Sequence, residues 1–170
     1  MLEMTTIQLR KLVKEDAKRL AELANNKSVW SNLRNKMPHP YALEDAQQFI
    51  ASADKENPTL SFGIYFEHEL CGVIGIIAQQ DVYRFSGEIG YWLGEPFWGK
   101  GIATQALKLI TEFAFDTLQL NRVFAASYAF NKASIRVLEK NGFVHEGVLK
   151  QAVFKNGEFH DEWRFGKLKE

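Results

Sequence analysis

The sequence lacks most of the features that would place it in a specialised class of protein. Of its 170 residues only one is a cysteine, Cys71, which excludes a disulfide framework and suits a reducing compartment. No apolar run reaches membrane-spanning length, and residues 1–6 show no basic segment followed by an apolar stretch. We therefore expect a soluble, cytoplasmic protein with no membrane partner.

An excess of charge of one sign is also missing. Lysine and arginine together number 21, as do aspartate and glutamate, so the formal net charge is +0. Without a positive excess to attract a phosphate backbone, a nucleic-acid partner is not expected. The 4 histidines are scattered and show no paired spacing, which together with the single cysteine argues against a zinc site.

The composition that is present suits a folded domain with a full core. Hydrophobic residues make up 46% of the chain and charged residues 25%, and no repeat, low-complexity segment or linker interrupts it. We therefore expect a single domain over residues 1–170. Cys71 lies in the apolar run 70–78, which has the length of a strand, so packing is favoured over a nucleophilic role for this thiol.

Hydrophobic periodicity predicts an α+β fold. The expected strands are 7–12, 60–66, 70–78, 88–93, 122–128, 144–149 and 161–168, and the expected helices are 15–24, 28–37, 43–50, 102–118 and 131–141. Turns are expected at 67–69 and 155–157, and Gly142 is placed to end a helix in a left-handed cap.

Segment 88–104 is the most informative part of the chain, because it predicts a strand, a glycine-rich turn and the start of a helix. Gly99 and Gly101 would let the N–H groups that enter the helix converge on a phosphate. A P-loop is disfavoured because Gly101 stands where a Ser or Thr should hold magnesium. A dinucleotide fingerprint is disfavoured because Gly99, Gly101 and Ala103 are too closely spaced. A tight turn without a ligand remains an alternative.

Segments 88–104 and 131–143 together resemble the GNAT family of acyl-CoA-dependent N-acetyltransferases. The likeness is greatest to the branch with ribosomal-protein N-terminal alanine acetyltransferases and spermidine acetyltransferases, and it covers essentially the whole chain. It implies a central, mostly antiparallel seven-stranded sheet, splayed between the fourth and fifth strands and flanked by helices, with acetyl-CoA in the gap. No metal is required, since converging N–H groups and a positive helix end suffice for the diphosphate.

The resemblance also implies which residues contact the cofactor. The residues that would bind the diphosphate through their backbone are Trp98, Gly99, Lys100, Gly101, Ile102, Ala103 and Thr104. The backbone edges of Tyr91, Trp92 and Leu93 would bond to the pantetheine arm as if it were an added strand. Asn131 would reach the same arm with its amide, cap the following helix, or do both.

Glu88 and Ser134 are the candidates for catalysis. Glu88, beside the expected thioester, would act as a base directly or through water; alternatively it is a strand-edge carboxylate paired with a cation. Ser134 resembles a serine that donates a proton in some members of this branch; alternatively it is an ordinary residue of a first helical turn. Two positions depart from the family pattern, because Trp98 replaces a Gln or Arg and Leu138 replaces a proton-donating tyrosine.

These assignments favour an N-acyltransferase that moves an acetyl group from acetyl-CoA to a primary amine by direct attack in a ternary complex. The acceptor would be a small-molecule amine or a protein N-terminus. A catalytically idle acyl-CoA-binding domain, acting as a sensor or assembly partner, is the alternative, because Leu138 cannot donate a proton. The sequence does not decide between a monomer and a homodimer.

Overall fold

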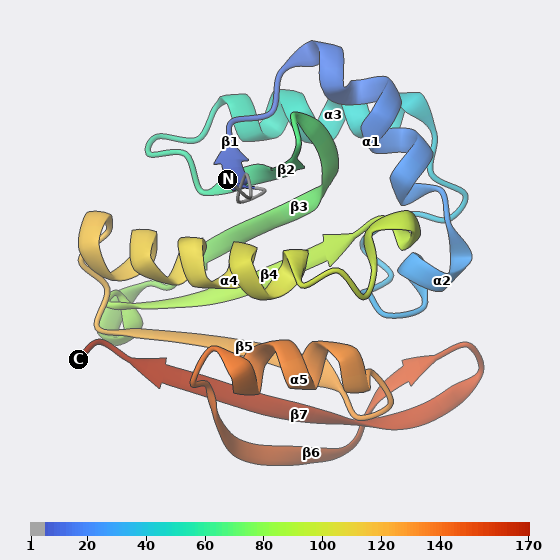
Figure 1. Cartoon of the computed structure of the whole chain (residues 1–170). Helices are drawn as coiled ribbons and strands as arrows, with labels where there is room; N and C mark the ends of the chain where they lie inside the picture. Colours follow the sequence, from blue (N-terminus) through green and yellow to red (C-terminus); the bar gives the residue numbers. More distant parts are fainter. Residues whose placement is uncertain (1–5) are drawn as a thin grey trace, which may run out of the picture. The chain divides into compact units, whose positions relative to one another are not determined.

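The computed structural model describes residues 6–170; residues 1–5, where no targeting segment is expected, lie outside the described part. The strands are β1 (Ile7–Arg10), β2 (Ser61–Phe66), β3 (Glu69–Ala78), β4 (Ser86–Leu93), β5 (Arg122–Tyr128), β6 (Val144–Lys155) and β7 (Glu158–Leu168) (Figure 1). The α-helices are α1 (Ala17–Ala24), α2 (Lys27–Trp30), α3 (Leu43–Asp54), α4 (Ile102–Glu112) and α5 (Lys132–Lys140). Short helical turns are η1 (Lys14–Asp16), η2 (Asp81–Tyr83), η3 (Glu95–Phe97) and the π-helical η4 (Phe113–Thr117).

The strands are hydrogen-bonded in the order β1-β2-β3-β4-β5-β7-β6. Strand β2 is antiparallel to β1 and β3, and β7 is antiparallel to β5 and β6, whereas β4 and β5 are parallel. The predicted seven-stranded, mostly antiparallel sheet is thus confirmed. The parallel register joins Ser86–Glu88 to Arg122–Phe124 and ends there, which is where the expected separation of the fourth and fifth strands would begin.

The chain forms two compact units. The first unit contains residues 6–75 and Tyr91–Ala106, and the second contains Ile76–Gly90 and Leu107–Glu170. Strands β3 and β4 and helix α4 contribute residues to both. No helix within residues 6–170 is both long and apolar enough to cross a membrane.

The core of the first unit is built by α1, α3 and the strands β2 and β3. The apolar stripes of the two helices and the inner faces of the strands supply its fully buried side chains, which include Leu20, Ala24, Ala46, Ile50, Ile64 and Ile74. Their burial follows from the period of the apolar positions, 3.6 residues in the helices and two in the strands.

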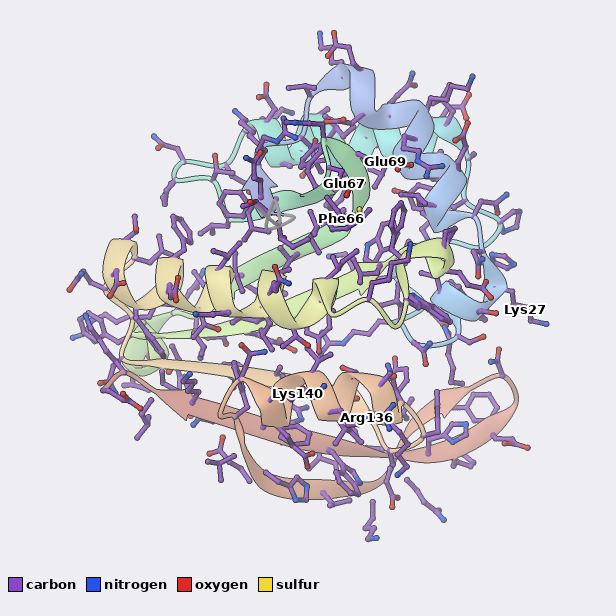
Figure 2. The ribbon with its side chains drawn as sticks, viewed as in Figure 1. Lys27, Phe66, Glu67, Glu69, Arg136 and Lys140 are labelled. Atoms are coloured by element: carbon purple, nitrogen blue, oxygen red, sulfur yellow. The ribbon has the colours of Figure 1, made fainter. Side chains whose placement is uncertain are left out.

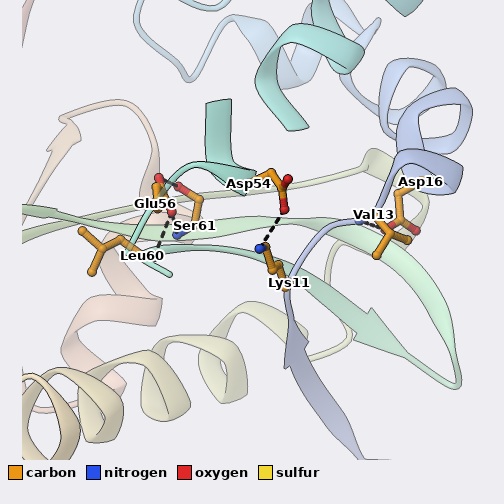
Figure 3. Close-up of polar contacts among 7 residues, drawn as sticks. All are labelled: Lys11, Val13, Asp16, Asp54, Glu56, Leu60 and Ser61. Carbon is orange, nitrogen blue, oxygen red and sulfur yellow. Dashed lines mark hydrogen bonds and ion pairs between the residues drawn. The ribbon is translucent and has the colours of Figure 1, made fainter. Parts of the chain in front are cut away.

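Carboxylates order the connections of the first unit (Figure 3). The carboxylate of Glu56 accepts hydrogen bonds from the backbone N–H groups of Leu60 and Ser61, both at 2.8 Å, just before β2. That of Asp16 accepts one from the Val13 N–H at 2.9 Å and fixes the entry into α1. The ion pair between Lys11 and Asp54, at 2.7 Å, is exposed and adds little stability.

The second unit packs α5 alongside β5 and β7 (Figure 1). Val123, Leu138 and Phe165 are each 0% exposed, so the helix and the two strands share a closed apolar layer. The Lys132 ammonium, at the start of α5, lies 5.2 Å from the centre of the Trp163 ring. As predicted, Gly142 has a positive φ of 76° after the helix.

Several of the predicted elements have wrong boundaries. The helix expected at 28–37 ends at Trp30, because the polar residues after it form turns in which side chains bond to the backbone, as Asn32 does to the Ser28 carbonyl. The helix expected at 102–118 is α-helical only to Glu112 and continues as the π-helical η4. Strand β6 continues to Lys155 and strand β7 begins at Glu158, so their hairpin is longer than predicted.

The longer hairpin contains a bulge that breaks the alternation on which the prediction relied. The register of β6 against β7 shifts between Leu149 and Val153, and Gln151 has a φ of 49°. The Asp161 carboxylate accepts the Gln151 N–H at 2.9 Å and so holds the bulge. A bulge moves the following side chains to the other face, which removes the two-residue period from the sequence.

The position of Cys71 leads to a test of the fold. This side chain is 0% exposed, and burial raises the pKa of its thiol to about 11. Only about one molecule in ten thousand then carries a thiolate at pH 7. We expect the native protein to resist iodoacetamide at pH 7 to 8 and to be alkylated once urea unfolds it, measured by intact mass. Native alkylation at the rate of a free thiol would contradict the placement of Cys71.

The raised pKa of the Cys71 thiol also makes the stability of the fold depend on pH. An unfolded cysteine ionises near pH 8.5, while the folded thiol stays protonated to a higher pH. The stabilisation that arises from the raised pKa is therefore complete below about pH 8.5 and decreases as the pH rises toward 11.

Candidate functional site

Strand β4 ends with three of the predicted cofactor residues next to one another. Tyr91 and Trp92 are half-buried, and Leu93 is 8% exposed. Directly after them, the Gly94 N–H donates to the Cys71 carbonyl at 2.8 Å, which ties the end of β4 to β3. The three residues therefore belong to a strand end that is fixed by its neighbour.

Gly72 permits an unusually close approach of the two strand backbones at this point. A Cβ atom at this position would overlap the Trp92 carbonyl oxygen and would lie 2.9 Å from the Cα of Leu93. No side chain fits there without a backbone shift. The lack of a side chain on β3 thus determines the path of β4 at Trp92.

The turn between β4 and α4 is closed by hydrogen bonds of its own. The Phe97 N–H donates to the Gly94 carbonyl at 3.0 Å, and the Trp98 N–H donates to the Glu95 carbonyl at 3.1 Å. The Trp98 indole N–H also donates to the Leu93 carbonyl, at 2.9 Å. The segment from Leu93 to Trp98 is therefore a compact, internally bonded loop.

Helices α1 and α2 hold this loop from outside. Asn26 caps α2 by accepting the Val29 N–H at 3.0 Å, and its Nδ2 donates to Glu95 at 2.7 Å. The side chain of Leu23 fills the space beside Gly94, where a Cβ would lie 2.5 Å from its Cδ2. The loop is thus anchored to residues about seventy positions earlier in the chain.

Phe97 is the apolar anchor of the loop, with 6% of its surface exposed. The Arg19 guanidinium and the Lys100 ammonium each lie 5.9 Å from the centre of its ring. Arg19 is oriented by Glu69, at 2.6 Å, which lies at the start of β3 (Figure 2). Cations over an aromatic ring stabilise it by about 0.5–1 kcal/mol at exposed sites.

Two glycines with left-handed backbone follow the loop. Gly99 has a φ of 73° and Gly101 a φ of 76°, and a Cβ on either would have no atom within 4 Å. Their glycine identity is therefore required by backbone conformation and not by crowding, since a residue with a Cβ is strained at such φ values. Open space lies beside both residues.

Helix α4 begins directly after this turn, and Ile102 anchors it in the core with 1% of its surface exposed. The Gln105 N–H donates to the Gly101 carbonyl at 3.2 Å. The N–H groups of the first helical turn have no carbonyl partner within the helix itself, and the helix dipole makes this end positive. The exposed side chain of Lys100 adds a positive charge. This arrangement suits an anion such as a diphosphate.

The second unit contains the other predicted site residues. Glu88 is half-buried on β4, where it pairs in register with Phe124 of β5. Asn131 precedes α5, and its Oδ1 accepts the Ser134 N–H at 3.2 Å. Asn131 therefore caps α5, which was one of its two predicted roles. Its predicted contact with the pantetheine arm, through Nδ2, stays a prediction. Ser134 itself is half-buried in the first turn of α5.

Leu138 lies one turn after Ser134 and is 0% exposed. Its side chain is part of the apolar layer beneath α5, so it contributes packing and has no group that can transfer a proton. Within residues 6–170 no group of three or more His, Cys, Asp or Glu side chains is placed to hold a metal ion.

The residues that support the turn were not predicted from the sequence. Asn26 has a local role as the cap of α2, but its bond to Glu95 and the contacts of Arg19 and Leu23 join residues that are many positions apart in the chain. Gly72 did carry a signal, since an isolated glycine within a strand often marks a close backbone approach.

Comparison with known proteins agrees with this geometry. A family model described as "Acetyltransferase (GNAT) domain" matches residues 6–144. The "Putative ribosomal N-acetyltransferase YdaF" of Bacillus subtilis (strain 168) is 32% identical over 170 residues, which cover 96% of this chain and 91% of that protein. The Spermidine N(1)-acetyltransferase of Escherichia coli (strain K12) is 27% identical over 160 residues, or 94% of this chain and 84% of that protein.

A solved structure shows the same fold. RimL, a ribosomal alpha-N-protein acetyltransferase in complex with coenzyme A, superposes with a TM-score of 0.84 at 25% sequence identity. The match covers 99% of this chain and 96% of RimL. The likeness extends over both units of the chain.

The close approach at Gly72 leads to a matched pair of variants. We expect Gly72→Ala to lower the free energy of unfolding by about 1–3 kcal/mol, because the added methyl group must displace the Trp92 backbone. Gly90→Ala is the control, since a Cβ at Gly90 meets nothing within 4 Å, and it should be neutral or stabilising by up to about 1 kcal/mol. Urea unfolding of both variants checks this. Equal stabilities would contradict the close approach.

Proposed function

Because this chain belongs to the GNAT acetyltransferase family, we propose that it transfers an acetyl group from acetyl-CoA to a primary amine by direct attack in a ternary complex. The chain is an N-acetyltransferase, and acetyl-CoA is its cosubstrate. The observation that carries the proposal is the turn from Trp98 to Ile102, with two left-handed glycines, open space beside them and a helix N-terminus after them.

In this proposal the diphosphate of acetyl-CoA binds to the turn through main-chain N–H groups. The groups concerned belong to Gly99, Lys100, Gly101, Ile102, Ala103 and Thr104. The Trp98 N–H, also predicted for this role, already donates to the Glu95 carbonyl at 3.1 Å. The glycines allow the diphosphate to approach the backbone without meeting a Cβ, and the positive helix end offsets its charge. Side-chain identity matters little for such contacts, so the presence of Trp98 in place of Gln or Arg is compatible with binding.

The pantetheine arm would lie along the end of β4. The backbone edges of Tyr91, Trp92 and Leu93 would pair with its amides in the manner of an added strand. Asn131 would donate a hydrogen bond from Nδ2 to the arm, while Oδ1 of the same side chain caps α5. Because the arm carries the thioester at its end, these contacts would set the position of the reacting carbonyl.

Aminolysis requires a neutral amine, so the need for a base depends on the acceptor. Deprotonation at pH 7 costs roughly 1 kcal/mol for an α-amino group of pKa near 8 and about 4–5 kcal/mol for an alkylamine of pKa near 10.4. Glu88 is the proposed base, acting directly or through a water molecule. It would accept a proton from the ammonium form of the acceptor, which leaves a neutral nitrogen to attack the carbonyl carbon. The proton that the nitrogen loses after attack would pass to solvent.

The tetrahedral intermediate then collapses with cleavage of the C–S bond. A strand N–H near Tyr91 or Trp92 would stabilise the oxyanion. The leaving thiolate, with a pKa near 8.5, is a good leaving group and would receive a proton from Ser134 or from solvent. Leu138 cannot supply this proton, because its side chain is aliphatic and buried.

The acceptor is proposed to be an amine of one of two kinds. The relatives named above are described as acting on ribosomal proteins and on spermidine, so a protein N-terminus and a small polyamine are the first candidates to screen. The balanced charge of the chain gives no reason to expect a nucleic-acid partner. A cytoplasmic location, a monomeric or homodimeric state and a single acetyltransferase domain over residues 1–170 complete the proposal.

Cofactor binding by the turn is tested with two glycines of similar conformation. Gly101→Ala and Gly157→Ala both place a Cβ on a left-handed residue, at φ of 76° and 80°, and neither Cβ would clash. Each should cost about 1–2 kcal/mol of stability. Only Gly101→Ala should weaken acetyl-CoA binding, by about tenfold or more, because its methyl group enters the space assigned to the diphosphate. Calorimetric titration separates the two; equal affinities would contradict the assignment.

The role of Glu88 is tested with Glu88→Gln, which keeps the shape of the side chain. We expect kcat/KM to fall by about a hundredfold at pH 7 with little change in acetyl-CoA affinity. The deficit should shrink as the pH approaches the pKa of the acceptor amine, since a neutral amine needs no base. Release of free thiol measures turnover, and Glu139→Gln, on the exposed surface of α5, is the control.

Two outcomes would overturn these roles. Full activity of Glu88→Gln at every pH would exclude Glu88 as the base. Tight acetyl-CoA binding without thiol release above background, across a library of peptide N-termini, polyamines and other amines, would favour the idle acyl-CoA-binding domain.

A further inference from the structure

We propose that Trp98 is a positioning residue that holds the diphosphate-binding turn in register with the end of β4. This inference rests on the proposed function, since it concerns the geometry with which the same site would take acetyl-CoA. It is carried by the contact between the Trp98 indole and the Leu93 carbonyl, at 2.9 Å.

Trp98 is bound to the loop at two points. Its backbone N–H donates to the Glu95 carbonyl and its indole N–H donates to the Leu93 carbonyl, so main chain and side chain bond to different residues of the loop. The residue as a whole is 42% exposed. The side chain is therefore held by this hydrogen bond rather than by burial in the core.

The position of Trp98 in the chain gives this bond its effect. It is the last residue before Gly99 and Gly101, which have the greatest backbone freedom of any residue type. On its other side, Leu93 and Gly94 are fixed, because Gly94 bonds to Cys71 of β3. The indole bond therefore connects the fixed strand end directly to the residue from which the glycine turn starts.

Two parts of one ligand depend on that connection. The pantetheine arm would bind to β4 and the diphosphate to the turn. The distance between these two parts of acetyl-CoA is limited by the covalent structure of the molecule. A turn that moves relative to β4 fits the two parts only in some of its conformations. Fixing the turn in advance lowers the entropic cost of binding.

The bond also occupies one group at the end of the strand. The Leu93 carbonyl accepts the indole proton, so Leu93 serves as the junction between strand and turn.

The inference is tested with Trp98→Phe, which keeps an aromatic ring and removes the N–H donor. Loss of one hydrogen bond should weaken acetyl-CoA binding by about three- to tenfold and raise its KM, with kcat nearly unchanged at saturation. Trp30→Phe is a matched control, because the Trp30 indole also donates to a backbone carbonyl at 2.9 Å, that of Met37 in another loop. This control should leave acetyl-CoA affinity unchanged.

A fragment of the cofactor separates positioning from general damage. S-acetylpantetheine lacks the diphosphate, so Trp98→Phe should leave its KM unchanged while it raises that of acetyl-CoA. An equal rise in KM for both substrates would overturn the inference about Trp98, as would an equal Kd of acetyl-CoA for Trp98→Phe and the unaltered protein. Neither result would contradict the proposed function. Failure of the unaltered protein to bind acetyl-CoA would overturn the proposed function and the inference with it.

Discussion

The structure around the candidate site depends on one constraint, which is that the first N–H groups of a helix have no carbonyl partner within that helix. At α4 these groups follow a turn of two left-handed glycines beside open space. An anion can satisfy them, and the helix dipole favours one at this end. The family to which the chain belongs uses a cosubstrate with a diphosphate, so the chemistry of the ligand and that of the helix end agree.

The start of α4 must also be held in a fixed position. Residues that are distant in the sequence provide the contacts that hold it. Gly72 brings the backbone of β4 close to β3, and Asn26 fixes Glu95 at the beginning of the turn. Phe97 is buried, and the cations of Arg19 and Lys100 each lie 5.9 Å from the centre of its ring. Their contribution is to reduce the number of conformations available to the segment that would bind the cofactor.

Local signals in the sequence were sufficient for the order of elements, the glycine turn and the cap of α5. They offered capping as one of the two roles of Asn131 and predicted Gly142 as a left-handed helix end, since both features depend on a few adjacent residues. Contacts such as that between Asn26 and Glu95 span 69 positions and leave no periodic pattern. The helix expected over 28–37 was wrong after Trp30 because local side-chain hydrogen bonds outweighed propensity. The catalytic roles of Glu88 and Ser134 remain predictions.

The proposed binding through main-chain amides has a consequence for how this protein can diverge. Such amides are present whatever side chains surround them, so most exchanges along the turn would preserve the chemical groups proposed to contact the ligand. The two left-handed positions are the exception, because there the backbone conformation itself restricts the residue type. An exchange at Gly99 or Gly101 would change the path of the backbone, whereas an exchange elsewhere along the turn would change only the surroundings of its amides.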